Sequence, residues 1–322
     1  MDWIIAHGDT DGICSAAIAL AARKGSEVFF SHPSGLAEDL KQVEGNVVIC
    51  DIALSSTFLQ EVMAELKRIA AGGGSILYID HHPLPRGFRK EDFPGKMAIS
   101  TMSCTSELTY LEFKDLIPSD MSRVAIYGAI GDYMDNTYEM RRILLDWEKR
   151  SMYLESGLLI QAIEAGGRDY EMKRKMVSFL ATNRTPSSDQ EIVEKAIAEA
   201  ISEEEMRKRV REEVKVFGSL AYVLDLKWSM GKSAVYARAY GKTPVGIGAE
   251  TRKGRVDMSI RTSSEQIDLN ELLQEIAPKH NGSGGGHPMA AGARVPEGKF
   301  FEFLEDFNAL VEKNERKRTV EY

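Results

Sequence analysis

The stretch Ser75-Ile76-Leu77-Tyr78-Ile79-Asp80-His81-His82 decides the fold and points to the chemistry of this chain. Its apolar part is short enough for one buried strand, and the strand ends in a carboxylate and two imidazoles. Neutral imidazole and ionised carboxylate together suit a divalent transition metal. We therefore expect metal-ligand side chains at the end of a strand.

Ligand-type residues also follow three other apolar runs. These are His7, Asp9 and Asp11 after Trp3–Ala6, Asp51 after Val47–Cys50, and Asp132 after Val124–Ile130. In the segment HGDTDG, positions 7, 9 and 11 point the same way if the chain stays extended. Because ligands bind outside the carboxyl ends of parallel strands, we expect all four groups to meet at one edge of a sheet.

Short apolar runs alternate with helical patterns through the first half of the chain. The expected strands are Trp3–Ala6, Glu27–Phe30, Val47–Cys50 and Ile76–Ile79, and the expected helices are Gly12–Lys24, Leu36–Val43 and Ser55–Ala71. This alternation predicts a mostly parallel sheet covered on both faces. Helical patterns then dominate from residue 103 to residue 184.

The composition changes again beyond a charged helical stretch. Strand-like runs return at Leu220–Leu226, Val245–Ala249 and Val256–Ile260, with helical patterns at Leu269–Ile276 and Phe300–Lys313. We therefore expect an α/β chain in three parts. These are a parallel-sheet domain at 1–185, a helical linker at 186–216 and a smaller α/β domain at 217–322.

The charge and composition exclude several classes of protein. The net charge of −8 argues against wrapping long duplex nucleic acid with a broad basic surface. Three distant cysteines in apolar surroundings predict buried thiols rather than disulfides. No signal peptide and no membrane-spanning run are expected, so we predict a cytoplasmic protein without a membrane partner.

The ligand-type residues are numerous enough for two metal ions. Three carboxylates, one or two imidazoles and a bridging aspartate would fill two sites and leave positions for water and substrate. Mixed histidine and carboxylate ligands favour manganese over magnesium or calcium, which prefer oxygen ligands. Two ions about 4 Å apart can activate a water molecule and neutralise charge on a phosphoryl group.

In this order and spacing, the motifs resemble those of the DHH phosphoesterase superfamily. They are HGDTDG, Asp51 in VVICDIALS, Asp80-His81-His82 and Gly131-Asp132, and the first is similar to the RecJ-like branch, of archaeal type. The resemblance implies two Mn²⁺ ions, with Mg²⁺ or Co²⁺ as substitutes. The implied ligands are His7, Asp9 and Asp51 for one ion, and Asp11, Asp51, His81 and Asp132 for the other.

The same resemblance assigns catalytic roles to the remaining two members of the triplet. It implies that His82 lies near the phosphoryl group, where it stabilises transition-state charge or donates a proton to the leaving oxygen. Asp80 would tune a neighbouring histidine or touch the metal.

A second signature lies near the end of the chain. Gly284-Gly285-Gly286-His287 resembles the GGGH motif of the DHH-associated C-terminal domain, which binds substrate phosphate and nucleotide. A glycine run exposes backbone N–H groups that can cradle an anion. Arg261 matches a substrate-binding Arg-Ser pair of the family, although Thr262 replaces the serine, and its guanidinium can grip phosphate with two donors.

Three functional hypotheses follow. The first is an exonuclease for single-stranded DNA or short RNA; the acidic charge and the expected lack of the added OB-fold domain of bacterial RecJ favour short strands. The second is a phosphatase for 3′-phosphoadenosine 5′-phosphate, or a cyclic-dinucleotide phosphodiesterase. The third is a RecJ-like replisome protein that binds the GINS complex.

Binding that tolerates any base calls for an aromatic side chain on which the base can stack. Tyr133, Tyr138 and Trp228 are candidates for this role. We expect each of them to pack in the core instead.

Overall fold

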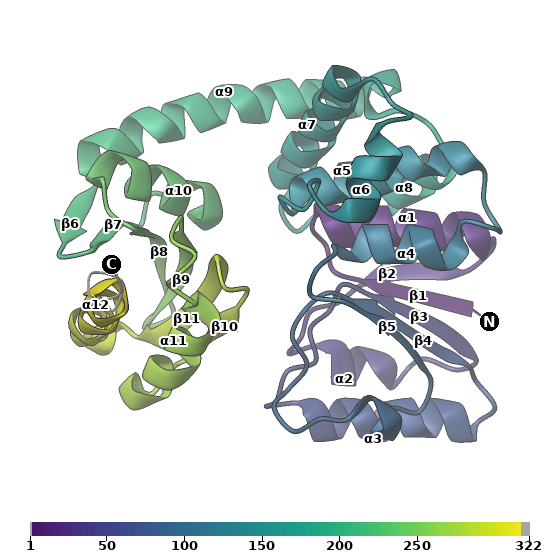
Figure 1. Ribbon diagram of the computed structural model, residues 1–322, viewed down its shortest axis with the longest axis horizontal. Coiled ribbons are helices and arrows are strands. Elements are labelled where there is room, and N and C mark those ends of the chain that lie inside the picture. Colours follow the sequence, from purple (N-terminus) through teal and green to yellow (C-terminus); the bar gives the residue numbers. More distant parts are fainter. Residues whose placement is uncertain (1, 317–322) are drawn as a thin grey trace. The chain divides into compact units, whose positions relative to one another are not determined.

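The computed structural model describes residues 2–316 and divides into two compact units, with the boundary between Ala200 and Ile201 (Figure 1). The boundary falls inside the helix α9, Gln190–Glu213. Ile192 and Ala196 on α9 pack in a core of the first unit, whereas Met206 and Val210 pack in a core of the second. Each unit therefore has its own hydrophobic core.

Five strands form the sheet of the first unit, in the order β2-β1-β3-β4-β5. Their bounds are β1 Asp2–Ala6, β2 Glu27–Phe30, β3 Asn46–Cys50, β4 Ile76–Asp80 and β5 Lys96–Ile99. Every neighbouring pair is parallel, which confirms the predicted fold class. The edge strand β5 was not predicted, because its sequence KMAI carries a lysine and lies partly exposed.

Helices cover both faces of this sheet (Figure 1). Alternate side chains of β1 face opposite cores, so Ile4 packs on one side of the sheet and Ile5 on the other. The core around Ile4 is covered by α1 Thr10–Ala22, α4 Thr105–Phe113, α5 Ser122–Gly131, α6 Tyr138–Leu144, α7 Lys149–Gly166 and α8 Tyr170–Ala181. The core around Ile5 is covered by α2 Leu36–Leu40 and α3 Leu59–Ala71.

One ligand group reaches the site in an unexpected way. The apolar run Val124–Ile130 lies inside the helix α5 and is not a strand, so Asp132 follows the end of a helix. The prediction that all four groups follow strands is therefore wrong for Asp132. Residues 124–129 are all buried, and a run without a polar face does not distinguish a strand from a buried helix.

The second unit has a six-stranded sheet in the order β10-β11-β9-β8-β7-β6. The strands are β6 Lys215–Phe217, β7 Leu220–Leu224, β8 Val245–Arg252, β9 Arg255–Thr262, β10 Ser283–Gly286 and β11 Ala290–Pro296. All pairs are antiparallel except β7 with β8. One face packs on α10 Met230–Gly241 and the end of α9, and the other on α11 Leu269–Ile276 and α12 Phe300–Arg316.

The side chains and helices also test two smaller predictions. Cys14, Cys50 and Cys104 are free thiols buried in the first unit, as predicted. Within residues 2–316, helices of the length and apolar character that a bilayer span requires do not occur.

Candidate metal centre

The segment from His7 to Gly12 turns the chain sharply from β1 into α1. Asp9 is the N-cap of α1, and its Oδ1 atom accepts a hydrogen bond of 3.0 Å from the backbone N–H of Gly12. A Cβ atom on Gly12 would lie 2.3 Å from the carbonyl oxygen of His7, so this close approach requires glycine. Asp11 therefore lies on the first helical turn, and the extended conformation considered for this segment ends at Asp9, because the helix begins at Thr10.

Asp51 lies at the centre of the cluster, directly after β3. Its backbone is left-handed, with φ of 62°, and its side chain is buried. The Oδ1 atom accepts a hydrogen bond of 3.1 Å from Thr105 Oγ1 and lies 3.5 Å from His81 Nε2. The Oδ2 atom lies 3.9 Å from His7 Nδ1 and has no hydrogen-bond partner among the described residues.

Asp11 is held by the start of the helix α4. The backbone N–H groups of Thr105 and Ser106 donate to its two carboxylate oxygens at 2.7 Å and 2.9 Å. A helix N-terminus favours a negative charge, because its first N–H groups lack partners within the helix. A Cβ atom on Gly128 of α5 would lie 2.8 Å from Asp11 Oδ1, so glycine allows α5 to approach the same carboxylate.

The three residues at the end of β4, Asp80, His81 and His82, make two separate sets of contacts. His81 is buried, and its Nε2 atom lies 3.1 Å from Asp132 Oδ2. His82 is turned differently, with its Nδ1 atom 2.8 Å from Asp80 Oδ1. The hydroxyl oxygen of the buried Tyr78 lies 2.8 Å from Asp80 Oδ2, so Asp80 connects Tyr78 to His82.

These side chains form overlapping groups that suit metal ions. In the first unit the groups are His7-Asp9-Asp51, Asp11-Asp51-His81 and Asp51-Asp80-His82, each with ligand atoms within 4.8 Å of one another. Asp51 belongs to all three groups. Asp132 extends the second group through its contact with His81. The structure thus brings together every residue of this unit that the sequence assigned to the site.

The electrostatics of Asp51 show whether a cation fits. Burial, together with the charges of Asp9, Asp11, Asp132 and Asp80, raises the pKa of Asp51 well above its usual range. A buried carboxylate with an unpaired oxygen is costly unless a positive charge compensates it. A divalent cation beside Asp51 would supply that charge, so the donor set and its burial fit the metal that the motifs imply.

The neighbouring groups form ion pairs with opposite pKa shifts. The charge of Asp9 raises the pKa of His7, and His7 in turn helps to hold the pKa of Asp9 low against the effect of burial. Burial opposes the charged form of His82, but Asp80 outweighs it and raises the pKa of His82. The pKa of His81 is lowered, mainly by burial, which favours the neutral imidazole that a metal requires.

Lys173 is a member of the site that the sequence did not reveal. This lysine of α8 is only 7% exposed, and its Nζ atom donates to the carbonyl oxygen of Gly8 at 2.5 Å. Burial lowers the pKa of Lys173, while the nearby charge of Asp9 opposes that shift. The ammonium group therefore supports the turn that carries His7 and Asp9. The separation of 165 positions between Lys173 and Gly8 leaves no local sequence signal.

The predicted substrate-binding residues lie on adjacent strands of the second unit. Arg261 lies near the end of β9, and its Nη1 atom donates to Ser259 Oγ at 2.9 Å. Gly284, Gly285 and Gly286 lie in β10 and pair with β11. The N–H group of Gly286 donates to Asn270 Oδ1 at 3.0 Å, and His287 begins the turn toward β11.

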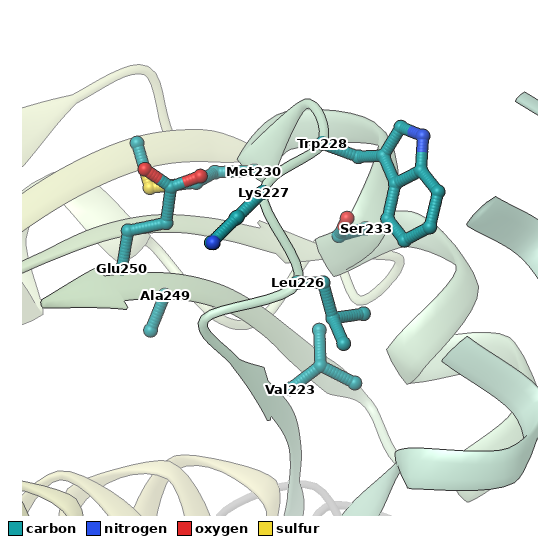
Figure 2. Close-up of a pocket in the computed structure, with 8 residues that line it drawn as sticks. All are labelled: Val223, Leu226, Lys227, Trp228, Met230, Ser233, Ala249 and Glu250. Atoms are coloured by element: carbon teal, nitrogen blue, oxygen red, sulfur yellow. The ribbon is translucent and has the colours of Figure 1, made fainter. Parts of the chain in front are cut away.

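A small hollow in the second unit is lined by a different set of residues (Figure 2). It is lined by side chains of β7, β8, the start of α10 and the segment between β7 and α10, including Trp228 and Met230. Its volume of about 10 Å³ is at the limit for a single water molecule. The hollow is therefore too small for a nucleotide.

Two family models match the chain. The DHH family, N-terminal domain, matches residues 3–131, and the DHHA1 domain matches residues 217–313. The first match contains the motifs from His7 to Gly131, and the second contains Arg261 and the GGGH motif. No curated protein matches the sequence.

Several solved structures share this fold. RecJ from Thermus thermophilus in complex with Mn²⁺ has a TM-score of 0.71 at 17% identity, over 97% of this chain and 52% of that chain. The pGpG-specific phosphodiesterase PggH from Vibrio cholerae has a TM-score of 0.60 at 14% identity, over 98% of this chain and 100% of the PggH chain. CDC45 from Entamoeba histolytica has a TM-score of 0.55 at 8% identity, over 96% of this chain and 95% of the CDC45 chain.

These likenesses establish a shared fold. The chain spans about half the length of the RecJ chain that it matches. It spans the whole length of PggH.

We predict that Asp51→Asn separates metal binding from folding. The substitution removes a buried negative charge, so the metal-free variant should unfold at the same temperature as the wild type or higher. A hundredfold excess of Mn²⁺ over its dissociation constant should stabilise the wild type by about 2.7 kcal/mol, and the variant should lose this gain. Thermal unfolding with and without Mn²⁺ measures both effects. Asp115→Asn, at an exposed position, is the control. If Mn²⁺ stabilised Asp51→Asn as much as the wild type, Asp51 could not be a ligand shared by both ions.

The metal-free protein should lose stability as the pH rises from about 4 to 8. The raised pKa values of Asp51 and Asp11, from 3.8, mean that the folded state keeps protons that the unfolded state releases. The raised pKa values of His7 and His82 act in the same direction above 6.5, whereas the lowered pKa of His81 opposes the decline below 6.5. Urea unfolding across this range should show the decline, and Asp51→Asn or added Mn²⁺ should reduce it. If the stability of Asp51→Asn fell equally steeply with pH, the raised pKa of Asp51 would not be the cause of the decline.

Lys173→Met should weaken the turn between β1 and α1. Methionine fills a similar volume but leaves the carbonyl of Gly8 without its donor, which costs about 1–3 kcal/mol of unfolding free energy. We expect Mn²⁺ affinity, measured by titration calorimetry, to fall with it. Lys175→Met is the matched control, because Lys175 is an exposed lysine of the same helix. Unchanged stability and unchanged affinity in Lys173→Met would remove Lys173 from the site.

Proposed function

Since the chain belongs to the DHH superfamily, of the RecJ-like type with a DHHA1 domain, we propose that it is a metal-dependent exonuclease for single-stranded DNA or short RNA. The observation that carries this proposal is the position of Asp51, which belongs to each group of metal-ligand atoms in the first unit. A carboxylate shared in this way suits two adjacent ions, and two-ion sites are suited to phosphoryl transfer.

The first ion would be held by His7, Asp9 and Asp51. The second would be held by Asp11, Asp51, His81 and Asp132. The mixture of imidazole and carboxylate favours Mn²⁺, with Mg²⁺ or Co²⁺ as substitutes, and RecJ from Thermus thermophilus, which has this fold, was crystallised with Mn²⁺. When bound, the ions would neutralise charge on the phosphoryl group and lower the pKa of a water molecule.

His82 is the residue that we assign to proton transfer. Its Nδ1 atom contacts Asp80, and we assign Nε2 to the proton transfer. The carboxylate of Asp80 raises the pKa of His82 against the effect of burial, so the imidazole holds a proton more readily. His82 would donate a proton from Nε2 to the oxygen that leaves phosphorus. Tyr78 would fix Asp80, and so the orientation of the ring.

The second unit would bind the adjoining phosphate and nucleotide through Arg261, Gly284, Gly285, Gly286 and His287. Short strands are favoured as substrates for two reasons. The net charge of −8 disfavours long nucleic acid, and PggH, whose name describes a dinucleotide enzyme, is matched over its whole length. The proposal includes a cytoplasmic location.

Two structural likenesses support alternative functions. The likeness to PggH also supports a small-nucleotide enzyme, such as a phosphatase of 3′-phosphoadenosine 5′-phosphate or a cyclic-dinucleotide phosphodiesterase. The likeness to CDC45 supports a replication partner such as GINS. The ligand set is complete in this chain, which favours an active enzyme even if such a partner binds.

We expect the protein with Mn²⁺ to shorten end-labelled DNA and RNA strands of two to about twenty nucleotides, one nucleotide at a time. The same assay includes 3′-phosphoadenosine 5′-phosphate and a cyclic dinucleotide, with Asp51→Asn as the inactive control. Gel electrophoresis of the strands and release of phosphate measure the two outcomes. Hydrolysis of a small nucleotide without shortening of any strand would reject the exonuclease in favour of the alternative.

A further inference from the structure

The helix α5 ends in a Schellman motif beside the metal centre. The N–H group of Met134 donates to the carbonyl of Ala129 at 2.8 Å, and that of Tyr133 donates to Ile130 at 3.2 Å. In this motif the residue after the C-cap adopts the left-handed conformation. Asp132 is the C-cap, and Tyr133 takes the left-handed position with φ of 57°.

Tyrosine is a poor choice for this position on grounds of folding alone. Glycine is the usual residue there, because a Cβ atom is crowded in the left-handed conformation. The side chain of Tyr133 is 85% exposed, so burial does not compensate for the strain. A residue that opposes the local preference without a packing benefit indicates a functional role.

The position of Tyr133 suggests what that role is. It directly follows Asp132, whose Oδ2 atom lies 3.1 Å from His81 Nε2, and adjacent Cα atoms are about 3.8 Å apart. The segment that follows is fixed to the domain: Thr137 Oγ1 donates to Glu107 Oε2 at 2.7 Å, and the Tyr153 hydroxyl donates to Asp135. The backbone of Tyr133 therefore lies next to a residue of the metal centre on a well-anchored segment, and its aromatic ring is exposed.

We infer that Tyr133 is a stacking surface for the nucleobase next to the phosphate that is cleaved. The inference rests on the proposed function and adds a base-binding residue to it. Stacking on an aromatic ring tolerates every base, because each base has a π-face. The ring supplies the interaction, so phenylalanine would serve as well as tyrosine.

The structure separates Tyr133 from the other aromatic residues that the sequence suggested. Trp228 packs with the Met206 and Val210 cluster and donates from Nε1 to Ser202 Oγ at 3.0 Å, so it serves the interior of the second unit. Tyr138 is 70% exposed but lies at the regular start of α6. The prediction that all three pack in the core is wrong for both tyrosines, and only Tyr133 occupies a strained backbone position.

Tyr133→Gly tests the inference, because it should affect folding and binding in opposite directions. Its melting temperature should equal or exceed that of the wild type, since glycine suits the left-handed position. With Mn²⁺ and a DNA trinucleotide, its KM should rise about tenfold, within the range that base stacking supplies. Tyr133→Phe should retain the wild-type KM. Leu145→Ala, at a side chain that is 84% exposed, should change neither quantity.

A fully abasic trinucleotide completes the test, because it keeps the phosphates and removes the bases. The wild type and Tyr133→Gly should have the same KM for this strand. A wild-type KM of Tyr133→Gly for the normal trinucleotide would overturn the inference and leave the proposed function intact. An equal rise in KM for both strands would assign Tyr133 to the phosphate path or the loop, and would also overturn it. Failure of the wild type to cleave either strand would overturn the proposed function, and the inference with it.

Discussion

The structure of the first unit depends on holding several carboxylates together in one buried place. Asp11, Asp51 and Asp80 are almost fully enclosed, and Asp9 and Asp132 lie beside them. Like charges at this distance repel, and burial increases the cost. The surrounding elements supply partial compensation: the N-terminus of α4 binds Asp11, and Tyr78 and His82 contact Asp80. Among the carboxylates of the described residues, Asp51 has a buried oxygen without a hydrogen-bond partner, and a cation is the partner that would satisfy it.

The topology of the sheet explains why this place is available. The strand β1 lies between β2 and β3, so the chain moves to one side of β1 and then to the other. At such a switch point the loops after the two central strands diverge and leave a crevice at the carboxyl ends. His7 follows β1 and Asp51 follows β3 at this crevice, and β4 adds Asp80 next to them. Residues far apart in sequence thus meet because their strands are neighbours and parallel.

Sequence reasoning succeeded where the chemistry coincides with a strand end. The strands before His7, Asp51 and Asp80 are short, apolar and bounded by polar residues, so their ends could be recognised. It was wrong about the element before Asp132, because a fully buried helix resembles a strand in sequence. It missed Lys173, whose contact with the turn after β1 depends on how α8 packs. Local patterns do not contain information about which distant helix covers a site.

Exposure was the other property that the sequence could not supply, and it bears on substrate choice. A cluster of carboxylates and imidazoles around metal ions acts on the phosphoryl group, which all phosphoesters share. Such a centre cannot by itself distinguish a strand from a small nucleotide. Selection must come from groups that contact the base or a second phosphate, and the groups that we propose for this role are Tyr133 in the first unit and Arg261 with the β10 glycines in the second. An aromatic ring kept in a strained and exposed position is consistent with selection for contact with a base rather than for stability. Under this proposal, the residues that decide the substrate lie outside the motifs that define the metal centre.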